Sequence, residues 1–277
     1  MNSQELGKLY DFTGRNIVVT GGAGVLGGEI ASALNGLGAN IALLDRDEIR
    51  AREKMTHFTG SPGKVICVFA DVLQRDILIA AEKVISDELG PVDALINAAG
   101  GNNSSATTSS DLSFFDLPVD ALRSVTDLNL LGTLLPCQVF GRGMAERKKG
   151  SILNISSMNA FRPLTRIPVY SAAKAAVSNF TQWLAVHMAQ NYSPEIRVNA
   201  IAPGFLLTEQ NRYLLTDQGT GEVTARGRLI LDHTPLGRFG KPEDLLGAVI
   251  WLLSPAASFV TGIIVPLDGG FSAFSGV

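Results

Sequence analysis

Short apolar runs alternate with longer amphipathic stretches along most of this 277-residue chain. The runs consist largely of Val, Ile and Leu without polar alternation, which is typical of strands buried on both faces. Seven runs have the length of a strand: 16–20, 40–45, 64–71, 92–100, 151–157, 195–203 and 262–268. The stretches between them predict helices, with long ones at about 118–148 and about 168–191. The pattern therefore predicts an α/β fold with a doubly wound parallel sheet of about seven strands and helices on both faces.

Two segments interrupt this alternation. Residues 101–117 are rich in Asn, Ser and Thr, and residues 204–234 separate the sixth run from the closing elements. Both follow the carboxyl ends of predicted strands, where ligands bind in open α/β sheets. We interpret 204–234 as a substrate lid within one domain that spans 1–277, because no linker-like stretch or internal repeat divides the chain.

Composition narrows the classes of protein. The net charge is −3 and no stripe of Lys and Arg stands out, which argues against a nucleic-acid surface. The longest strongly apolar stretch, 245–253, has half the length of a membrane span, and residues 1–15 lack the apolar core of a secretory signal. The two cysteines fit buried thiols, and the three scattered histidines do not indicate a metal site. We expect a soluble, cytoplasmic protein.

A glycine-rich turn, TGGAGVLGG at 20–28, lies between the first strand and its helix. Glycines permit close approach of a ligand, and the unpaired N–H groups of a helix N-terminus attract phosphate, so the turn predicts a dinucleotide site. Asp45 ends the second strand, where a carboxylate accepts ribose hydroxyls and repels a 2′-phosphate, which favours NAD. Arg46 can instead pair with a 2′-phosphate, so NADP stays an alternative. A helix N-cap is the structural alternative for Asp45.

Tyr170 and Lys174 lie four residues apart on a predicted helix, with Ser157 thirteen residues upstream of the tyrosine. Residues i and i+4 are neighbours on a helix surface. A nearby ammonium group favours the phenolate, so we expect Lys174 to lower the pKa of Tyr170 from about 10 toward neutrality. The Ser157 hydroxyl would then hold a substrate oxygen beside the tyrosine. The three residues predict a proton-transfer site.

Together these features resemble the short-chain dehydrogenase/reductase family, over nearly the whole chain from Thr20 to Gly270. Val25 stands where the family has the middle glycine of its cofactor turn, and Ala98 replaces the second Asn of its NNAG motif. The resemblance implies a Rossmann-type fold and a nicotinamide cofactor. The cofactor contacts that it implies, besides Tyr170 and Lys174, are Gly21, Gly24, Leu26, Gly27, Asp45, Arg46, Asp71, Val72, Asn97, Ala98, Gly100, Pro203, Gly204, Leu206 and Thr208.

The resemblance also implies a catalytic tetrad, which consists of Asn129, Ser157, Tyr170 and Lys174. Its chemistry is hydride transfer to or from nicotinamide C4. In this scheme Tyr170 moves the proton, Lys174 holds the nicotinamide ribose, Ser157 orients the reacting oxygen and Asn129 holds a water that leads to solvent. The structural alternatives are that Asn129 caps or kinks its helix and that Ser157 only bonds neighbouring backbone.

Polar residues around the predicted catalytic site point to the substrate. Asn159 and Arg162 lie between the catalytic serine and tyrosine, and Asn102 and Gln210 lie in the two interrupting segments. An arginine can hold a carboxylate in two parallel hydrogen bonds, so this set favours a sugar acid. Surface or subunit contacts are the alternative for each of them.

Several segments, such as NISSMNAFRPLTRIPVYSAAK, resemble the D-mannonate oxidoreductase (fructuronate reductase) branch of the family. This resemblance implies interconversion of D-mannonate and D-fructuronate. The alternatives are gluconate, 2-deoxygluconate, sorbitol or a 3-oxoacyl substrate, and a catalytically idle dinucleotide sensor. The family resemblance further implies a homotetramer. The apolar face of the Tyr170 helix that would form its interface comprises Ala175, Ala176, Phe180, Trp183, Leu184 and Val186.

Overall fold

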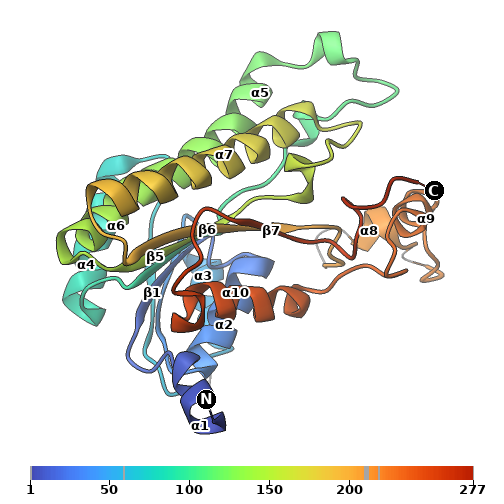
Figure 1. Cartoon of the computed structure of the whole chain (residues 1–277). Coiled ribbons are helices and arrows are strands. Elements are labelled where there is room, and N and C mark those ends of the chain that lie inside the picture. Colours follow the sequence, from blue (N-terminus) through green and yellow to red (C-terminus); the bar gives the residue numbers. More distant parts are fainter. Residues whose placement is uncertain (1, 59, 209–211, 218, 277) are drawn as a thin grey trace.

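A computed structural model describes residues 2–58, 60–208, 212–217 and 219–276. Within these residues seven strands form one sheet in the order β3-β2-β1-β4-β5-β6-β7, and all neighbouring strands are parallel (Figure 1). The strands are β1 (Asn16–Thr20), β2 (Asn40–Asp45), β3 (Val65–Phe69), β4 (Ala94–Asn97), β5 (Gly150–Ile155), β6 (Ile196–Pro203) and β7 (Ile264–Leu267). The doubly wound α/β fold predicted from the apolar runs is therefore confirmed.

Helices cover both faces of this sheet (Figure 1). The longer helices are α2 (Val25–Gly36), α4 (Arg75–Leu89), α5 (Val119–Thr126), α6 (Gly132–Arg147), α7 (Pro168–Asn191), α9 (Ala225–Asp232) and α10 (Leu246–Leu253). The shorter ones are α1 (Ser3–Leu9), α3 (Glu48–Met55), α8 (Arg212–Leu215) and the single turns η1 (Ser104–Ala106), η2 (Phe114–Asp116), η3 (Asp127–Leu131), η4 (Met158–Ala160), η5 (Pro242–Leu245) and η6 (Pro255–Ala257). No described helix combines the length and the apolar character that a membrane crossing needs.

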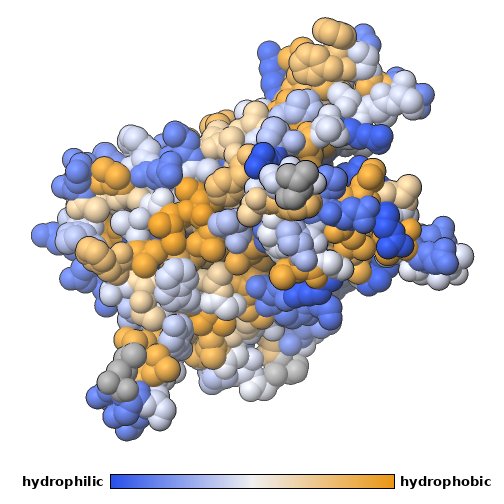
Figure 2. All heavy atoms as spheres, turned by 45° about the vertical axis from the view of Figure 1, so that its right-hand side comes forward, coloured by the Kyte–Doolittle hydropathy of each residue, from blue (hydrophilic) through white to orange (hydrophobic). Residues whose placement is uncertain are grey.

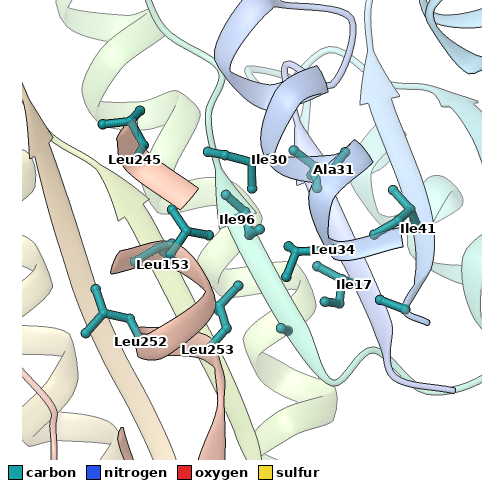
Figure 3. Packing of buried hydrophobic residues seen from close by; sticks show 14 of the residues in the cluster. Ile17, Ile30, Ala31, Leu34, Ile41, Ile96, Leu153, Leu245, Leu252 and Leu253 are labelled. Carbon is teal, nitrogen blue, oxygen red and sulfur yellow. The ribbon is translucent and has the colours of Figure 1, made fainter. Parts of the chain in front are cut away.

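The core has two halves, one on each face of the sheet. Alternate residues of β1 point to opposite faces, so Ile17 packs with α2 and α10, and Val18 packs with α4, α6 and α7. Figure 3 shows the first half, where Ile17 lies close to Leu34 of α2 and Leu252 comes from α10. Because both faces are covered, most positions of the central strands are apolar.

The strand order reverses between β1 and β4, which is where ligands bind in such sheets. The segments that follow β4, β5 and β6 lie at the same edge of the sheet as the turn after β1. The segment around η2 projects from the body (Figures 1 and 2), and Phe114 and Phe115 on it are 62% and 91% exposed. The interpretations of 1–277 as one domain and of 204–234 as a lid stay predictions.

Candidate active site

The turn between β1 and α2 has glycine where a side chain would not fit. Gly21 has φ +63°, and a Cβ on it would lie 2.8 Å from the Cα of Ala99 in the segment after β4. A Cβ on Gly27 would overlap the carbonyl oxygen of Gly21, which already accepts a hydrogen bond from the Gly24 N–H at 2.9 Å. Gly24 is the N-cap of α2 and makes no side-chain capping bond, so the first N–H groups of the helix are not satisfied by a side chain. Such a terminus suits a phosphate.

Leu26 follows in the first turn of α2, and its side chain packs against the core. The side chain is only partly buried, and its main chain lies in the glycine turn.

The Asp45 carboxylate is fixed beside this turn. Its Oδ2 accepts a hydrogen bond from the Ala23 N–H at 3.1 Å, and its Oδ1 accepts one from the Asp47 N–H at 3.0 Å. The N-cap of α3 is Asp47, which accepts from the Arg50 N–H, so the N-cap alternative for Asp45 is wrong. Each Asp45 oxygen keeps acceptor capacity for a ribose hydroxyl. The Arg46 side chain is exposed.

Asp71 and Val72 follow β3. The Asp71 carboxylate accepts hydrogen bonds from the Leu73 N–H at 2.9 Å and from the Gln74 side chain at 3.3 Å, so it fixes the turn that leads to α4. Val72 is 7% exposed and packs against Gly132, where a Cβ would lie 3.0 Å from a Val72 methyl group. Both residues lie at the carboxyl edge of the sheet, as a contact with adenine requires.

Asn97 lies differently from what its motif implies. Its side chain is 1% exposed and donates to Asn154 Oδ1 at 2.8 Å and to Cys137 Sγ at 3.2 Å. These bonds direct the Asn97 amide into the core between β4, β5 and α6 because strand side chains there are covered on both faces. Only the main chain of Asn97 is therefore open to a cofactor contact. Ala98 and Gly100 follow outside the strand, and Gly100 is exposed.

The candidate catalytic residues come together at the start of α7. Lys174 is 4% exposed, and its Nζ donates to the Ile155 carbonyl at 2.8 Å and lies 5.7 Å from the centroid of the Tyr170 ring. Ser157 lies two residues after the end of β5 and caps η4, with its Oγ accepting from the Asn159 N–H at 3.2 Å. The i,i+4 spacing on α7 and the end of β5 thus place the phenol, the ammonium and the serine hydroxyl in one site.

The pKa expectation for Tyr170 is wrong for the protein alone. Burial raises the pKa of the Tyr170 phenol, and a hydrogen bond with Ser157 lowers it by less. Burial also lowers the pKa of the Lys174 ammonium to about 8. Desolvation disfavours both charged forms, so each group tends to its neutral state. Proximity of Lys174 does not by itself make Tyr170 a base at neutral pH.

Asn129 lies in a π-helical turn, η3, between α5 and α6. Its Nδ2 donates to the Gly101 carbonyl at 2.7 Å and to the Val125 carbonyl at 2.8 Å, while its Oδ1 accepts from the Gly101 N–H at 3.2 Å. A Cβ on Gly100 would lie 2.9 Å from Asn129 Oδ1 and 3.2 Å from Lys174 Nζ. The side chain therefore fixes the segment after β4 next to Lys174. Turns of this kind recur at functional sites.

The segment after β6 packs against the end of β7. The Gly204 N–H donates to the Leu267 carbonyl at 3.0 Å, and a Cβ on Gly204 would lie 2.6 Å from the Cα of Asp268. Pro203 is buried, and the Leu206 side chain is 7% exposed and packs in the core, where it also lines a pocket beside β7. The Thr208 carbonyl accepts from the first residue of α8.

The candidate substrate residues are only partly assembled around this site. Asn159 is 5% exposed, and its Oδ1 is buried without a hydrogen-bond partner among the described residues. Arg162 is exposed, and its Nε donates to the Ser272 carbonyl at 3.2 Å. Asn102 is exposed and donates to Thr107, so the structure gives it a local contact. Gln210 lies outside the described residues.

A family model described as enoyl-(acyl carrier protein) reductase matches residues 21–272, and relatives with similar sequences are oxidoreductases. The chain belongs to the short-chain dehydrogenase/reductase family. It is an NAD(P)-dependent oxidoreductase of this family, and the family resemblance inferred from the sequence is confirmed.

Three relatives of this short-chain dehydrogenase/reductase are informative. An uncharacterized oxidoreductase, UxuB, from Bacillus subtilis is 44% identical over 276 residues, which cover 96% of this chain and 98% of that one. The crystal structure of a proposed D-mannonate oxidoreductase from Haemophilus influenzae with bound NAD is 44% identical, with a TM-score of 0.91 and coverage of 98% and 100%. A gluconate 5-dehydrogenase from Burkholderia cenocepacia, in complex with NADP and tartrate, is 29% identical, with a TM-score of 0.84 and coverage of 97% and 99%.

In this short-chain dehydrogenase/reductase, polar side chains also join β5 to α7, and the sequence analysis did not identify them. Asn154 donates to Thr181 Oγ1 at 2.9 Å. The Ser156 hydroxyl donates to the Lys174 carbonyl at 3.1 Å and lies 2.7 Å from the Ser178 hydroxyl. The available signal was a pair of polar residues at alternate positions of an otherwise apolar run. These bonds fix the helix that carries Tyr170 and Lys174.

Proposed function

We propose that this oxidoreductase interconverts a sugar acid and its keto form, with D-mannonate and D-fructuronate as the pair and NAD as the cofactor. The reaction is D-mannonate + NAD⁺ ⇌ D-fructuronate + NADH + H⁺. The observation that carries the proposal is the grouping of Ser157, Tyr170 and Lys174 at the carboxyl edge of the sheet, with Arg162 on the turn that follows Ser157. The sugar-acid enzymes among the relatives support the substrate class.

The residues present fit a dinucleotide. A Cβ on Gly27 would overlap the Gly21 carbonyl oxygen, so the turn keeps this close backbone packing only with glycine at 27. The N-terminus of α2 has no side-chain cap, and its N–H groups suit a phosphate. The fixed Asp45 carboxylate at the end of β2 suits a ribose with free hydroxyls and repels a 2′-phosphate, which favours NAD over NADP. When bound, the nicotinamide supplies a hydride to the keto carbon or accepts one from the alcohol carbon.

The side chains of the site handle the proton. In the reductive direction the Tyr170 hydroxyl donates a proton to the substrate oxygen, and the Ser157 hydroxyl donates a hydrogen bond to the same oxygen. Because burial raises its pKa, the Tyr170 phenol stays protonated at neutral pH, which suits reduction. In the oxidative direction the phenolate has to accept that proton, so we expect oxidation to need a higher pH.

Arg162 is our candidate partner for the substrate carboxylate. Its exposed guanidinium carries five N–H donors, and the bond to Ser272 uses only the one on Nε. Charge-assisted hydrogen bonds contribute about 1.5–3 kcal/mol. Arg162→Ala should therefore raise the KM for the sugar acid roughly 10- to 150-fold with little effect on NADH binding. Arg166→Ala, on the same loop, is the matched control, and an unchanged KM in Arg162→Ala would contradict this role.

The test of the function is NADH oxidation by D-fructuronate, with gluconate-derived keto acids, a ketose for sorbitol and a 3-oxoacyl thioester as competing substrates. Tyr170→Phe should lower kcat by about 10²- to 10⁴-fold, because it removes the proton donor, while its NADH affinity stays unchanged. Tyr192→Phe, at the far end of α7, should match the wild type. Faster turnover of another substrate would show that it, and not the sugar acid, is the preferred substrate. NADH binding without turnover of any of them would favour the catalytically idle sensor.

We also propose a homotetramer in which α7 packs against a second copy. Trp183 and Val186 are each 57% exposed, and the Trp183 ring stacks on Phe180 at 6.2 Å and on His187 at 4.7 Å. A groove of about 880 Å³ lies between α6 and α7 beside these rings. Leu184 is 8% exposed and packs mainly in the core of its own chain, and it also lines this groove.

A further inference from the structure

The C-terminal segment 268–276 turns back on itself after β7. The Asp268 carboxylate accepts hydrogen bonds from the Gly270 and Ser272 N–H groups, both at 2.9 Å. The Gly270 carbonyl accepts from the Ala273 and Phe274 N–H groups, both at 3.1 Å. These local bonds give the segment a defined shape although it carries no strand or helix.

This segment contacts three other parts of the chain: the segment after β6, the end of α9 and the turn after Ser157. Phe271 packs edge-on against Phe205, in the segment after β6, with 5.3 Å between ring centroids. His233, at the end of α9, lies 6.2 Å from the rings of both Phe271 and Phe274. The third contact is the hydrogen bond from Arg162 Nε to the Ser272 carbonyl. The C-terminus accordingly lies beside α9 (Figure 1).

The bond to Ser272 constrains how Arg162 can bind an anion. An arginine binds a carboxylate in two parallel hydrogen bonds, either through Nε and one terminal nitrogen or through both terminal nitrogens. With Nε already donating to Ser272, the end-on pair of terminal nitrogens remains. Holding a long, exposed side chain in one orientation before the ligand arrives also reduces the entropy that binding costs.

We propose that the C-terminal segment 268–276 positions Arg162 for the substrate carboxylate, so that the specificity of the site depends on a segment 110 residues away in sequence. The segment acts through Arg162 and touches no reacting atom. The assignment of the carboxylate rests on the proposed function. The coupling between the segment and Arg162 does not.

A double-mutant cycle tests the coupling. Truncation after Gly270 removes the Ser272 carbonyl and both phenylalanine rings, and should raise the KM for the sugar acid about 5- to 20-fold while kcat and NADH affinity change less than about twofold. In the Arg162→Ala background the same truncation should change KM less than about twofold, because the residue it positions is gone. Equal effects of the truncation in both backgrounds would show that the segment affects KM independently of Arg162, and would overturn the proposal. Should the truncated chain not fold, Phe274→Ala takes its place in the cycle.

Hydrogen exchange gives a readout that needs no substrate. Arg162→Ala should speed the exchange of the amides in 271–274 several-fold, since the segment loses its bond to the loop after Ser157. Arg162→Lys, which can still donate one bond, should restore part of this protection, and Arg166→Ala should leave exchange unchanged. If exchange in Arg162→Ala equals that of the wild type, the proposal fails, whether or not a sugar acid proves to be the substrate.

Discussion

Gly27→Ala is the sharpest test of the dinucleotide site. The added methyl group would overlap the Gly21 carbonyl oxygen, well inside the 3.0 Å below which such contacts are essentially never found, and would lie 3.1 Å from the Gly21 carbonyl carbon. Relief requires the turn or the start of α2 to move. Since the same oxygen accepts from the Gly24 N–H, movement of the turn also strains that bond.

The magnitude follows from these contacts. Overpacking of this kind costs about 1–3 kcal/mol, and weakening one hydrogen bond adds about 0.5–1.5 kcal/mol. The higher helix propensity of Ala than of Gly offsets at most about 1 kcal/mol of this loss in unfolding free energy. We expect a net loss of about 1–3 kcal/mol in unfolding free energy. We also expect NADH affinity to fall by about tenfold or more, because the displaced turn is the surface that we propose for the phosphates.

Gly28→Ala is the matched control. The methyl group there would meet only the flexible end of the Lys54 side chain, which can move away. NADH affinity from fluorescence titration and the midpoint of thermal unfolding should separate the two variants. Wild-type affinity in Gly27→Ala, or an equal loss in Gly28→Ala, would refute the argument from close approach.

Three further predictions concern the cofactor, the proton and the assembly. Asp45→Ser should weaken NAD binding about tenfold and raise the ratio of NADP to NAD turnover, because the charge that repels a 2′-phosphate is gone. An unchanged ratio in initial-rate assays would count against this role of Asp45. Oxidation of the sugar acid should accelerate as pH rises from about 7 to above about 9, because the raised pKa of Tyr170 means that the phenolate forms only at high pH. The rate of reduction should stay level over that range. A plateau of the oxidation rate below about pH 8 would contradict the raised pKa. Trp183→Glu should dissociate the assembly in light scattering, because it places a charge on the apolar face of α7, and an unchanged mass would exclude that face.

The sequence was sufficient for the order of the elements because parallel strands covered on both faces need continuous apolar runs. It was less informative about where they end. The apolar run predicts one strand over 92–100, yet β4 covers only Ala94–Asn97, and the Ala99 that follows lies close against Gly21. The pattern likewise predicts one helix over about 118–148, yet the π-helical turn at Asn129 divides it.

The site was predictable where spacing along one element decides proximity. Tyr170 and Lys174 lie together because a helix brings i and i+4 together. The orientation of Asn97 into the core and the bond between Arg162 and Ser272 depend on how distant segments meet, which no local period encodes. The pKa of Tyr170 likewise depends on burial, which a motif does not reveal.

The polar hydrogen bonds between the β5 segment and α7 fix the position of the helix along the strand. Asn154 lies on β5 and Ser156 directly follows the strand, and their partners on the helix are at positions 174, 178 and 181, one turn after another. A slide of α7 by one turn would leave buried amide and hydroxyl groups without partners, so the helix has one permitted register. Changes in the loops around the candidate site would therefore leave Tyr170 at a fixed height above the sheet.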